Sequence, residues 1–237
     1  MIIAILFFAT LIRSMLGFGE ALIAVPLLAL LIPINEAAPV AVLVSITIAL
    51  LIVALDWRHV HLQSVGSLLI STLFGIPIGL WMLTTIPEAI VKAILSFVLA
   101  SFSIFALTRK NAHLADDRLA WVFGFFAGIL GGAYGMNGPP LAIFGALRGW
   151  EPAKFRATLQ AYFLPASIAG MAGYALSGLW TAPVNAIYFQ SLPAVIIATL
   201  AGRALGSRIP RERFSTYVYG GLIVIAAVLL YQSLGQR

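Results

Sequence analysis

Long apolar runs alternate with short polar breaks along the whole chain. Eight apolar segments lie at about residues 2–33, 37–55, 64–83, 88–108, 119–148, 157–178, 184–207 and 214–234. A transmembrane helix needs about 20 mostly apolar residues, so each segment is long enough to cross a bilayer. The pattern predicts an all-α polytopic membrane protein.

The first and fifth of these segments differ from the others because each is interrupted near its middle. The interruptions are Leu16–Glu20 in the first, followed by Pro26, and Gly131–Gly138 in the fifth, followed by Pro139-Pro140. Glycine is a poor helix former, and proline lacks the amide that the helix ladder needs. Proline is tolerated in the first helical turn. We therefore expect segments 1 and 5 to be broken or re-entrant, with a half-helix starting at Pro139-Pro140.

The two halves of the chain resemble each other. The stretch 72–75 (Thr-Leu-Phe-Gly) resembles 199–202 (Thr-Leu-Ala-Gly), and both belong to small-residue patterns typical of helix packing in membranes. Ordered matches of this kind predict two membrane repeats, residues 1–110 and 119–237, joined by a cytoplasmic linker at 111–118.

The basic residues bear on topology because cytoplasmic loops are enriched in Lys and Arg. If all eight segments crossed fully, the first two basic loops would face one side and the last two the other. If segments 1 and 5 are hairpins entering from opposite sides, all four face the cytoplasm and the repeats are inverted. Eight ordinary spans with an imperfect charge bias are the alternative. The four basic loops are 56–63, 109–118, 148–156 and 208–213.

Composition narrows the class further. Of the 237 residues, 62% are hydrophobic and 9% charged, against about 25% charged in soluble domains. The absence of cysteine excludes disulfides and thiol chemistry, and we expect no metal or cofactor, since His59-Val60-His61 has poor metal spacing. The net charge of +6 lies in loops, so it reflects membrane topology and predicts no nucleic-acid partner. The apolar N-terminus is expected to be a retained segment.

Broken helices at membrane depth indicate transport. Lipid cannot satisfy the unpaired backbone groups of a break, so breaks survive only inside protein or around a wet cavity. Inverted halves with matched broken segments point to a binding site at the membrane centre. Free amides at half-helix N-termini suit an anion. The alternative is that the glycines only allow close helix packing.

The residues of the two breaks are the first candidates for the binding site. Phe18 and Tyr134 are expected to occupy similar places, and the Tyr134 hydroxyl and the Asn137 amide could both donate hydrogen bonds to an oxyanion. The substrate-binding candidates in the breaks are Gly17, Phe18, Gly19, Tyr134, Gly135, Asn137 and Gly138.

Ionisable and polar residues inside the segments are further candidates, because intramembrane charges are functional by default. Arg13 and Glu20, seven residues apart, could share a face: Arg13 would bind an anion and Glu20 carry a proton, or the two could form a structural pair. Arg203 could reach an anion pathway or snorkel to the surface. Ser45 and Gln160, in corresponding segments, could line the same cavity or bond back to their own helices.

These residues resemble a known family. Gly17-Phe18-Gly19 with Pro26, the break leading to Pro139-Pro140-Leu141, and two four-segment halves are similar to the TauE/SafE sulfite exporters, also called TSUP permeases. The resemblance implies a multi-pass carrier in the bacterial or archaeal inner membrane. Its substrates would be small sulfur-containing anions such as sulfite, sulfoacetate or other sulfonates.

The sequence and the resemblance together predict a secondary transporter, an exporter that works by alternating access and is driven by an ion or substrate gradient. Glu20 is the candidate proton-coupling residue. A carrier of another small anion, such as a carboxylate, and a membrane scaffold subunit without transport of its own are the alternatives. An enzyme is not expected, since the membrane segments hold no Ser-His or paired-Asp arrangement and no HExxH motif.

Overall fold

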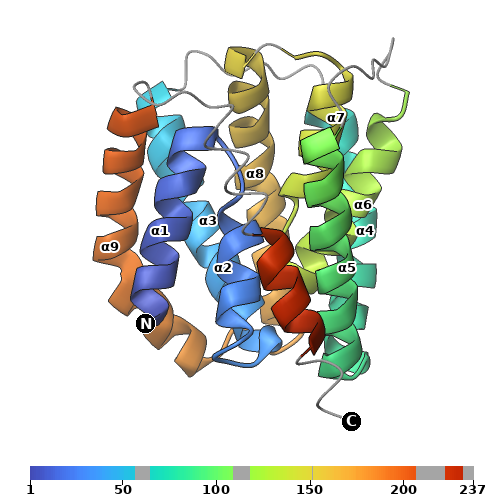
Figure 1. Ribbon diagram of the computed structural model, residues 1–237, viewed down its shortest axis with the longest axis vertical. Helices are drawn as coiled ribbons and strands as arrows, with labels where there is room; N and C mark the ends of the chain where they lie inside the picture. Colours follow the sequence, from blue (N-terminus) through green and yellow to red (C-terminus); the bar gives the residue numbers. More distant parts are fainter. Residues whose placement is uncertain (57–64, 109–117, 151, 207–221, 232–237) are drawn as a thin grey trace.

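The computed structural model describes residues 1–56, 65–108, 118–150, 152–206 and 222–231, and within these ranges all regular structure is helical (Figure 1). This confirms the all-α prediction for the described part of the chain. The predicted linker (apart from residue 118) and His59, His61 and His113 lie outside it. The helices are α1 Ile2–Leu16, α2 Glu20–Leu28, α3 Ile34–Asp56, α4 Val65–Thr85, α5 Glu88–Thr108, α6 Ala120–Tyr134, α7 Gly138–Leu147, α8 Pro152–Leu176, α9 Ala182–Gly206 and a last helix Leu222–Tyr231.

The first apolar segment is broken at the predicted glycines. Gly17 ends α1 with a φ of 93°, and its amide donates to the Arg13 carbonyl. Gly19, which precedes α2, has a φ of 102°. Left-handed backbone of this kind costs glycine little and other residues much more, so the break at this point follows from the local sequence.

The fifth segment is broken in the same way. Gly135 ends α6 with a φ of 65°, and α7 begins at Gly138 with Pro139 and Pro140 in its first turn. The expected start of a half-helix at the two prolines is therefore confirmed. Proline fits this turn because the first amides of a helix have no partner within the helix.

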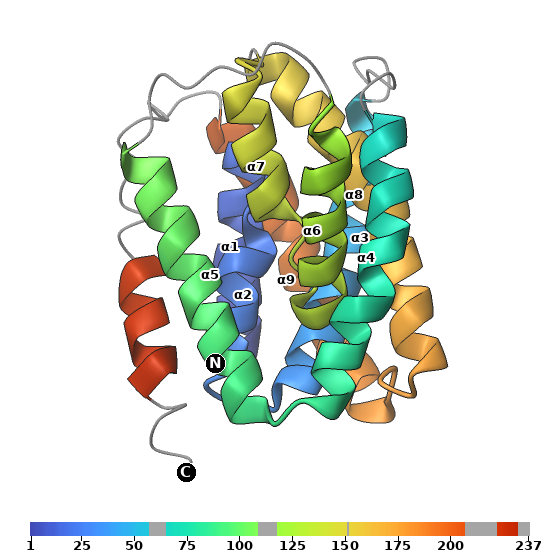
Figure 2. The ribbon, with the colours of Figure 1, turned by 90° about the vertical axis from the view of Figure 1, so that its right-hand side faces the viewer.

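Both broken segments reverse direction at their breaks (Figures 1 and 2). α1 runs away from the end of the bundle where the N-terminus lies, and α2 runs back toward it. α6 runs from the opposite end of the bundle, and α7 returns to that end. The C-terminal ends of α3, α5, α7 and α9, which precede the four basic stretches, lie together at that opposite end.

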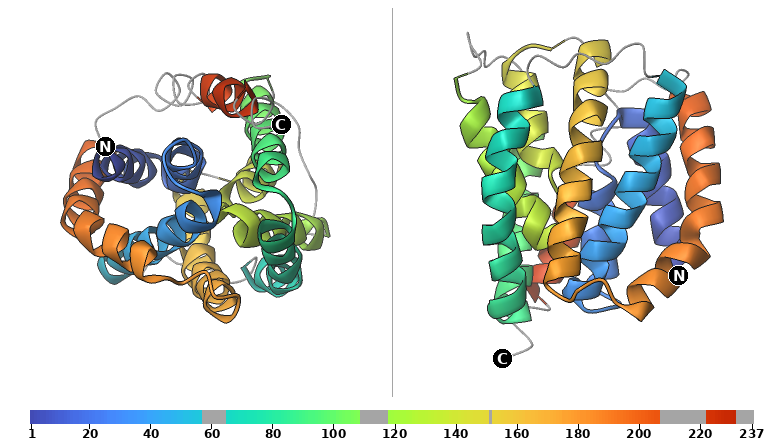
Figure 3. Two further views of the ribbon diagram at one scale, coloured as in Figure 1. Left: turned by 90° about the horizontal axis from the view of Figure 1, so that it is seen from below. Right: turned by 180° about the vertical axis from the view of Figure 1, so that it is seen from behind.

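Helices of the first half of the chain pack against helices of the second half (Figure 3). α4 packs along α6, α1 packs along α9, and α3 packs against α8. Gly75 and Gly79 of α4 face Gly128 and Gly132 of α6 so closely that a Cβ on any of them would meet the backbone of the other helix. Gly202 of α9 approaches α1 in the same manner. Small residues allow such close approach in membrane proteins.

Among the described residues, four helices are long and apolar enough to cross a membrane by length and composition: Ile34–Ala54, Val65–Thr85, Glu88–Thr108 and Ala182–Leu205. Large apolar side chains are exposed on the outside of the bundle, for example Phe74, Trp81 and Phe97, as expected for a polytopic protein in lipid. α1 and α6 have 15 residues each, which gives roughly 22 Å of helix, short of the bilayer core.

Candidate functional site

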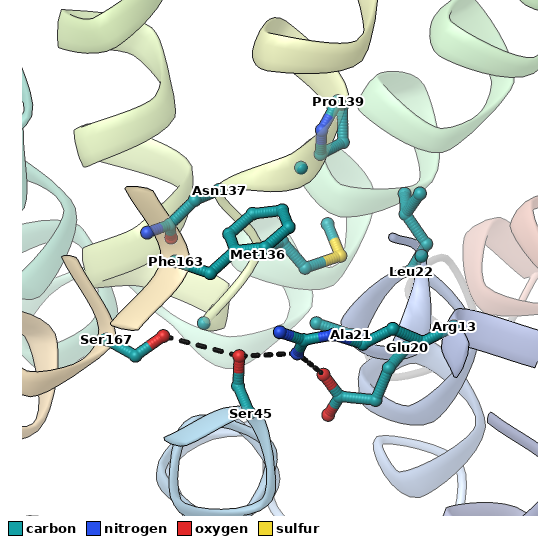
Figure 4. A pocket seen from close by; sticks show the side chains of 13 residues that line it. Arg13, Glu20, Ala21, Leu22, Ser45, Met136, Asn137, Pro139, Phe163 and Ser167 are labelled. Atoms are coloured by element: carbon teal, nitrogen blue, oxygen red, sulfur yellow. Dashed lines mark hydrogen bonds and ion pairs between the residues drawn. The ribbon is translucent and has the colours of Figure 1, made fainter. Parts of the chain in front are cut away.

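A pocket lies where the two breaks face the middle of α3 and α8 (Figure 4). Its volume is about 20 Å³, enough for roughly one ordered water molecule. The pocket is therefore nearly filled by its own side chains. It is lined by Arg13, Gly19, Glu20, Ala21, Leu22, Ser45, Gly135, Met136, Asn137, Gly138, Pro139, Phe163 and Ser167.

Arg13 is the central group of this pocket. Its Nη1 donates to Glu20 Oε2 at 3.0 Å and to Ser45 Oγ at 2.7 Å. Its Nη2 lies 3.4 Å from Gln160 Oε1, and its guanidinium carbon lies 4.9 Å from the centroid of the Phe163 ring, a cation–π distance. The guanidinium thus joins α1 to α2, α3 and α8.

The Arg13–Glu20 ion pair is buried, with side-chain exposures of 3% and 1%. The sequence left pairing open as one of two alternatives, and the structure shows the pair. The expected shared helix face is wrong: α1 ends at Leu16 and α2 starts at Glu20, so the chain reversal brings the two side chains together. Arg13 Nε and Glu20 Oε1 are buried without a hydrogen-bond partner among the described residues. Because unpaired buried polar atoms are costly, these two atoms point to a role for the pair beyond packing.

The two half-helix N-termini at the pocket are not equivalent. Gly19–Leu22, which include the first turn of α2, line the pocket, and first-turn amides have no partner in their own helix and carry the positive end of the dipole. In α7 the first turn contains Pro139 and Pro140, which have no N–H to donate. The expectation of free amides at both N-termini therefore holds better for α2 than for α7.

Asn137 is held by a chain of hydroxyl groups behind the pocket. Thr72 Oγ1 lies 2.7 Å from the Leu68 carbonyl and 2.9 Å from the Gly124 carbonyl, and carbonyls only accept, so the Thr72 proton points to them. The Tyr162 hydroxyl, 2.5 Å from Thr72 Oγ1, is then the donor in that bond. Tyr162 also interacts with the side chain of Asn137, and its oxygen remains able to accept from the amide nitrogen.

Most of the predicted site residues meet at this pocket. Gln160, next to it, donates from Nε2 to the Gly17 carbonyl at 3.0 Å while its Oε1 faces Arg13. Gln160 therefore ties the first break to the ion pair. The predicted residues that line the pocket directly are Arg13, Gly19, Glu20, Ser45, Gly135, Asn137 and Gly138.

Besides Gly17 and Gln160, three predicted residues do not line the pocket. The Phe18 ring packs edge-on against Phe102 of α5, with 6.4 Å between ring centroids. The Tyr134 hydroxyl donates to the Val91 carbonyl of α5 at 2.9 Å. Arg203 is exposed on α9. Phe18 and Tyr134 thus attach the two breaks to α5.

The expected equivalence of Phe18 and Tyr134 is wrong. Tyr134 is the last residue of α6, as Leu16 is the last residue of α1. Phe18 lies between the helices of its hairpin, as Met136 does in the second hairpin. The physical reason is that the left-handed glycines Gly17 and Gly135 fix where each first helix ends.

The sequence analysis missed four lining residues: Ala21, Leu22, Phe163 and Ser167. Phe163 and Ser167 follow Gln160 at three and seven residues on α8, a spacing that places all three on one helix face. The prediction of Gln160 could therefore have led to them. Ser167 Oγ donates to Ser45 Oγ at 3.3 Å.

Comparison with known proteins adds an independent finding. The family model described as "Sulfite exporter TauE/SafE" matches residues 2–229. A "Probable sulfite/organosulfonate exporter TauE" of Cupriavidus necator is 28% identical over 178 residues, which cover 74% of this chain and 69% of that protein. No solved structure matches the chain significantly.

Proposed function

Because the chain belongs to the TauE/SafE sulfite exporter family, we propose that it is a secondary transporter that exports small sulfur-containing anions such as sulfite or organosulfonates. Members of this family are membrane transporters and not enzymes, in agreement with the resemblance seen in the sequence. The name of the Cupriavidus necator relative supports the substrate class. The buried Arg13 in the pocket is the observation that carries the proposal for this chain.

Arg13 supports an anionic substrate through both its cost and its surroundings. Taking a cation out of water is expensive, and an apolar pair would often be as stable as a buried ion pair. Arg13 nevertheless lies at a pocket that also contains the first turn of α2, and its Nε has no hydrogen-bond partner in the part of the chain that the structure describes. An oxyanion here would accept from Nε, from α2 amides and from the hydroxyls of Ser45 and Ser167.

Glu20 is the proposed proton carrier. Its Oε2 accepts from Arg13 Nη1, so the ionised carboxylate occupies the place that the substrate anion would take. Protonation of Glu20 removes this competition and frees the guanidinium for the anion. This exchange would couple anion movement to a proton gradient.

Alternating access between inverted repeats is the proposed mechanism. In each of the pairs α4–α6 and α1–α9, one helix of residues 1–110 packs against one helix of residues 119–237 through a glycine contact. A pocket with room for about one water must open for a larger anion to enter. We place the protein in the inner membrane. In the proposed topology, the basic stretches that follow α3, α5, α7 and α9 face the cytoplasm.

Uptake into liposomes that contain only the purified full-length chain tests the function. We expect sulfite or an organosulfonate to be carried, with thiosulfate and small carboxylates as comparison anions. Arg13→Gln should reduce the rate at least about 10-fold, which is about 1.4 kcal/mol. Arg203→Gln, which changes an arginine outside the pocket lining, should leave it unchanged. Transport of carboxylates alone would favour the alternative carrier, and no transport by the chain alone would favour a scaffold.

Cysteine labelling tests the hairpin topology, since the chain has no native cysteine. Single cysteines at Asn35, at the start of α3, and at Trp150, between α7 and α8, should label from opposite faces of the membrane. Eight full crossings would place both on the same face, and that outcome would rule out the paired hairpins.

A further inference from the structure

Two charged side chains line the pocket in the described part of the chain, Arg13 and Glu20. Their charges cancel when both are ionised. We propose that the pocket accepts singly charged anions, one with each proton, so that a transport cycle moves no net charge. The proposal rests on the proposed anion transport and adds the charge of the substrate and the stoichiometry.

The groups around the ion pair offer no further full charge in the described residues. α3 contributes Ser45, α8 contributes Phe163 and Ser167, and the second break contributes Met136 and Asn137. All of these are uncharged. The N-terminus of α2 adds a partial positive charge of about half a unit, which helps to hold an anion and does not balance a second full charge.

Three loading states follow from these groups. With the pocket empty and Glu20 ionised, the net side-chain charge is zero. An anion that enters while Glu20 stays ionised leaves at least one uncompensated negative charge. A singly charged anion that enters with a protonated Glu20 restores zero, and a doubly charged anion does not. Because an uncompensated buried charge is strongly unfavourable, the neutral combination of one proton and one monoanion is selected.

The geometry of Arg13 supports the binding of one anion for each proton. Its Nη1 is used by Glu20 and Ser45, and its Nε has no partner among the described residues. Nε and Nη2 share one edge of the guanidinium, and Nη2 makes a long contact of 3.4 Å to Gln160 Oε1, so this edge suits one oxyanion group bound through two oxygens. Protonation of Glu20 leaves the charge of the guanidinium to that one group. Hydrogen sulfite and monosulfonates present such a group with a single charge.

Methanesulfonate and sulfate form the probe pair, because the two ions have nearly the same shape and differ by a methyl group in place of a charged oxygen. In liposomes that contain the full chain, methanesulfonate should move at least about 10-fold faster than sulfate under the same pH gradient, equal to about 1.4 kcal/mol. Its rate should not change when a potassium gradient with valinomycin imposes a membrane potential.

Glu20→Gln keeps the shape of the side chain and removes its proton exchange. In this variant methanesulfonate flux should lose its dependence on the pH gradient and gain a dependence on membrane potential, since the anion then moves alone. Glu88→Gln is the matched control, because Glu88 pairs with Lys92 outside the pocket lining. Its flux should behave as in the native protein.

The outcomes separate the two proposals. If methanesulfonate and sulfate move at equal rates, or if methanesulfonate flux in the native chain responds to membrane potential, anion transport stands and the charge assignment is wrong. If no tested anion moves, both proposals fail. The native chain alone decides these points, so they do not depend on whether the Glu20 variant folds.

Discussion

Replacing Arg13 with methionine tests the reasoning about the buried ion pair. The substitution removes the hydrogen bonds of 3.0 Å to Glu20 and 2.7 Å to Ser45, and it keeps a long side chain in the space. Glu20, whose side chain is 1% exposed, is then left without its cation. The structure therefore predicts that the loss comes mainly from the unpaired carboxylate and not from a cavity.

The expected magnitude follows from that assignment. Removing one partner of a buried ion pair costs about 3–5 kcal/mol, whereas replacing both partners by uncharged groups is often nearly neutral. Arg13→Met should thus lower the free energy of unfolding by about 3–5 kcal/mol. The double variant Arg13→Met, Glu20→Gln should recover at least about half of this, because no charge remains. The loss in Arg13→Met should shrink as the pH falls, since a protonated Glu20 carries no charge to leave unpaired.

Unfolding of the purified protein in mixed micelles, followed by tryptophan fluorescence, provides the measurement. A double-mutant cycle over Arg13→Met, Glu20→Gln and the double variant gives the coupling energy. A double variant as unstable as the sum of the two single variants would refute the ion-pair argument. A loss in Arg13→Met that is the same at acid and neutral pH would show that the carboxylate is not its cause.

Two further predictions concern packing and the hydroxyl chain. Gly75→Ala should destabilise the protein by about 1–3 kcal/mol in the same unfolding assay, because the added Cβ would meet the α6 backbone. The control Gly170→Ala, which has open space at the Cβ position, should stabilise the protein by up to about 1 kcal/mol. Equal effects of the two substitutions would contradict the close α4–α6 contact. Tyr162→Phe should raise the KM for anion uptake about fivefold, which is the equivalent of one hydrogen bond of about 1 kcal/mol. The control Tyr188→Phe removes a hydrogen bond to the Thr47 hydroxyl and should leave the KM unchanged. If neither substitution changes the KM, Tyr162 does not contribute to the site.

The breaks were predictable because their cause is local. Gly17 and Gly135 adopt left-handed backbone, and Pro139-Pro140 can begin a helix but not continue one. These rules act within a few residues of sequence. Arg13 and Glu20 were also predictable as site candidates, because an ionisable residue in an apolar segment needs a polar partner wherever the helices lie.

The direction of individual side chains was not predictable, because it depends on how helices rotate against distant neighbours. The Tyr134 hydroxyl is directed to Val91, 43 residues away in sequence. Phe163 reaches the pocket because α8 packs against α3, whose Ser45 also contacts Arg13. A local pattern gives the face of a helix but not the partner of that face.

The prolines of α7 make the contributions of the two hairpins to anion binding different. The first hairpin contributes the ion pair and a helix start whose amides are available, while the second contributes Met136, Asn137 and a helix start with two donors missing. Electrostatic attraction then comes mainly from residues 1–110, and steric fit comes mainly from residues 119–237. Substitutions in the second hairpin should therefore change which anion fits without changing how its movement is coupled, so this hairpin is the place to redesign selectivity.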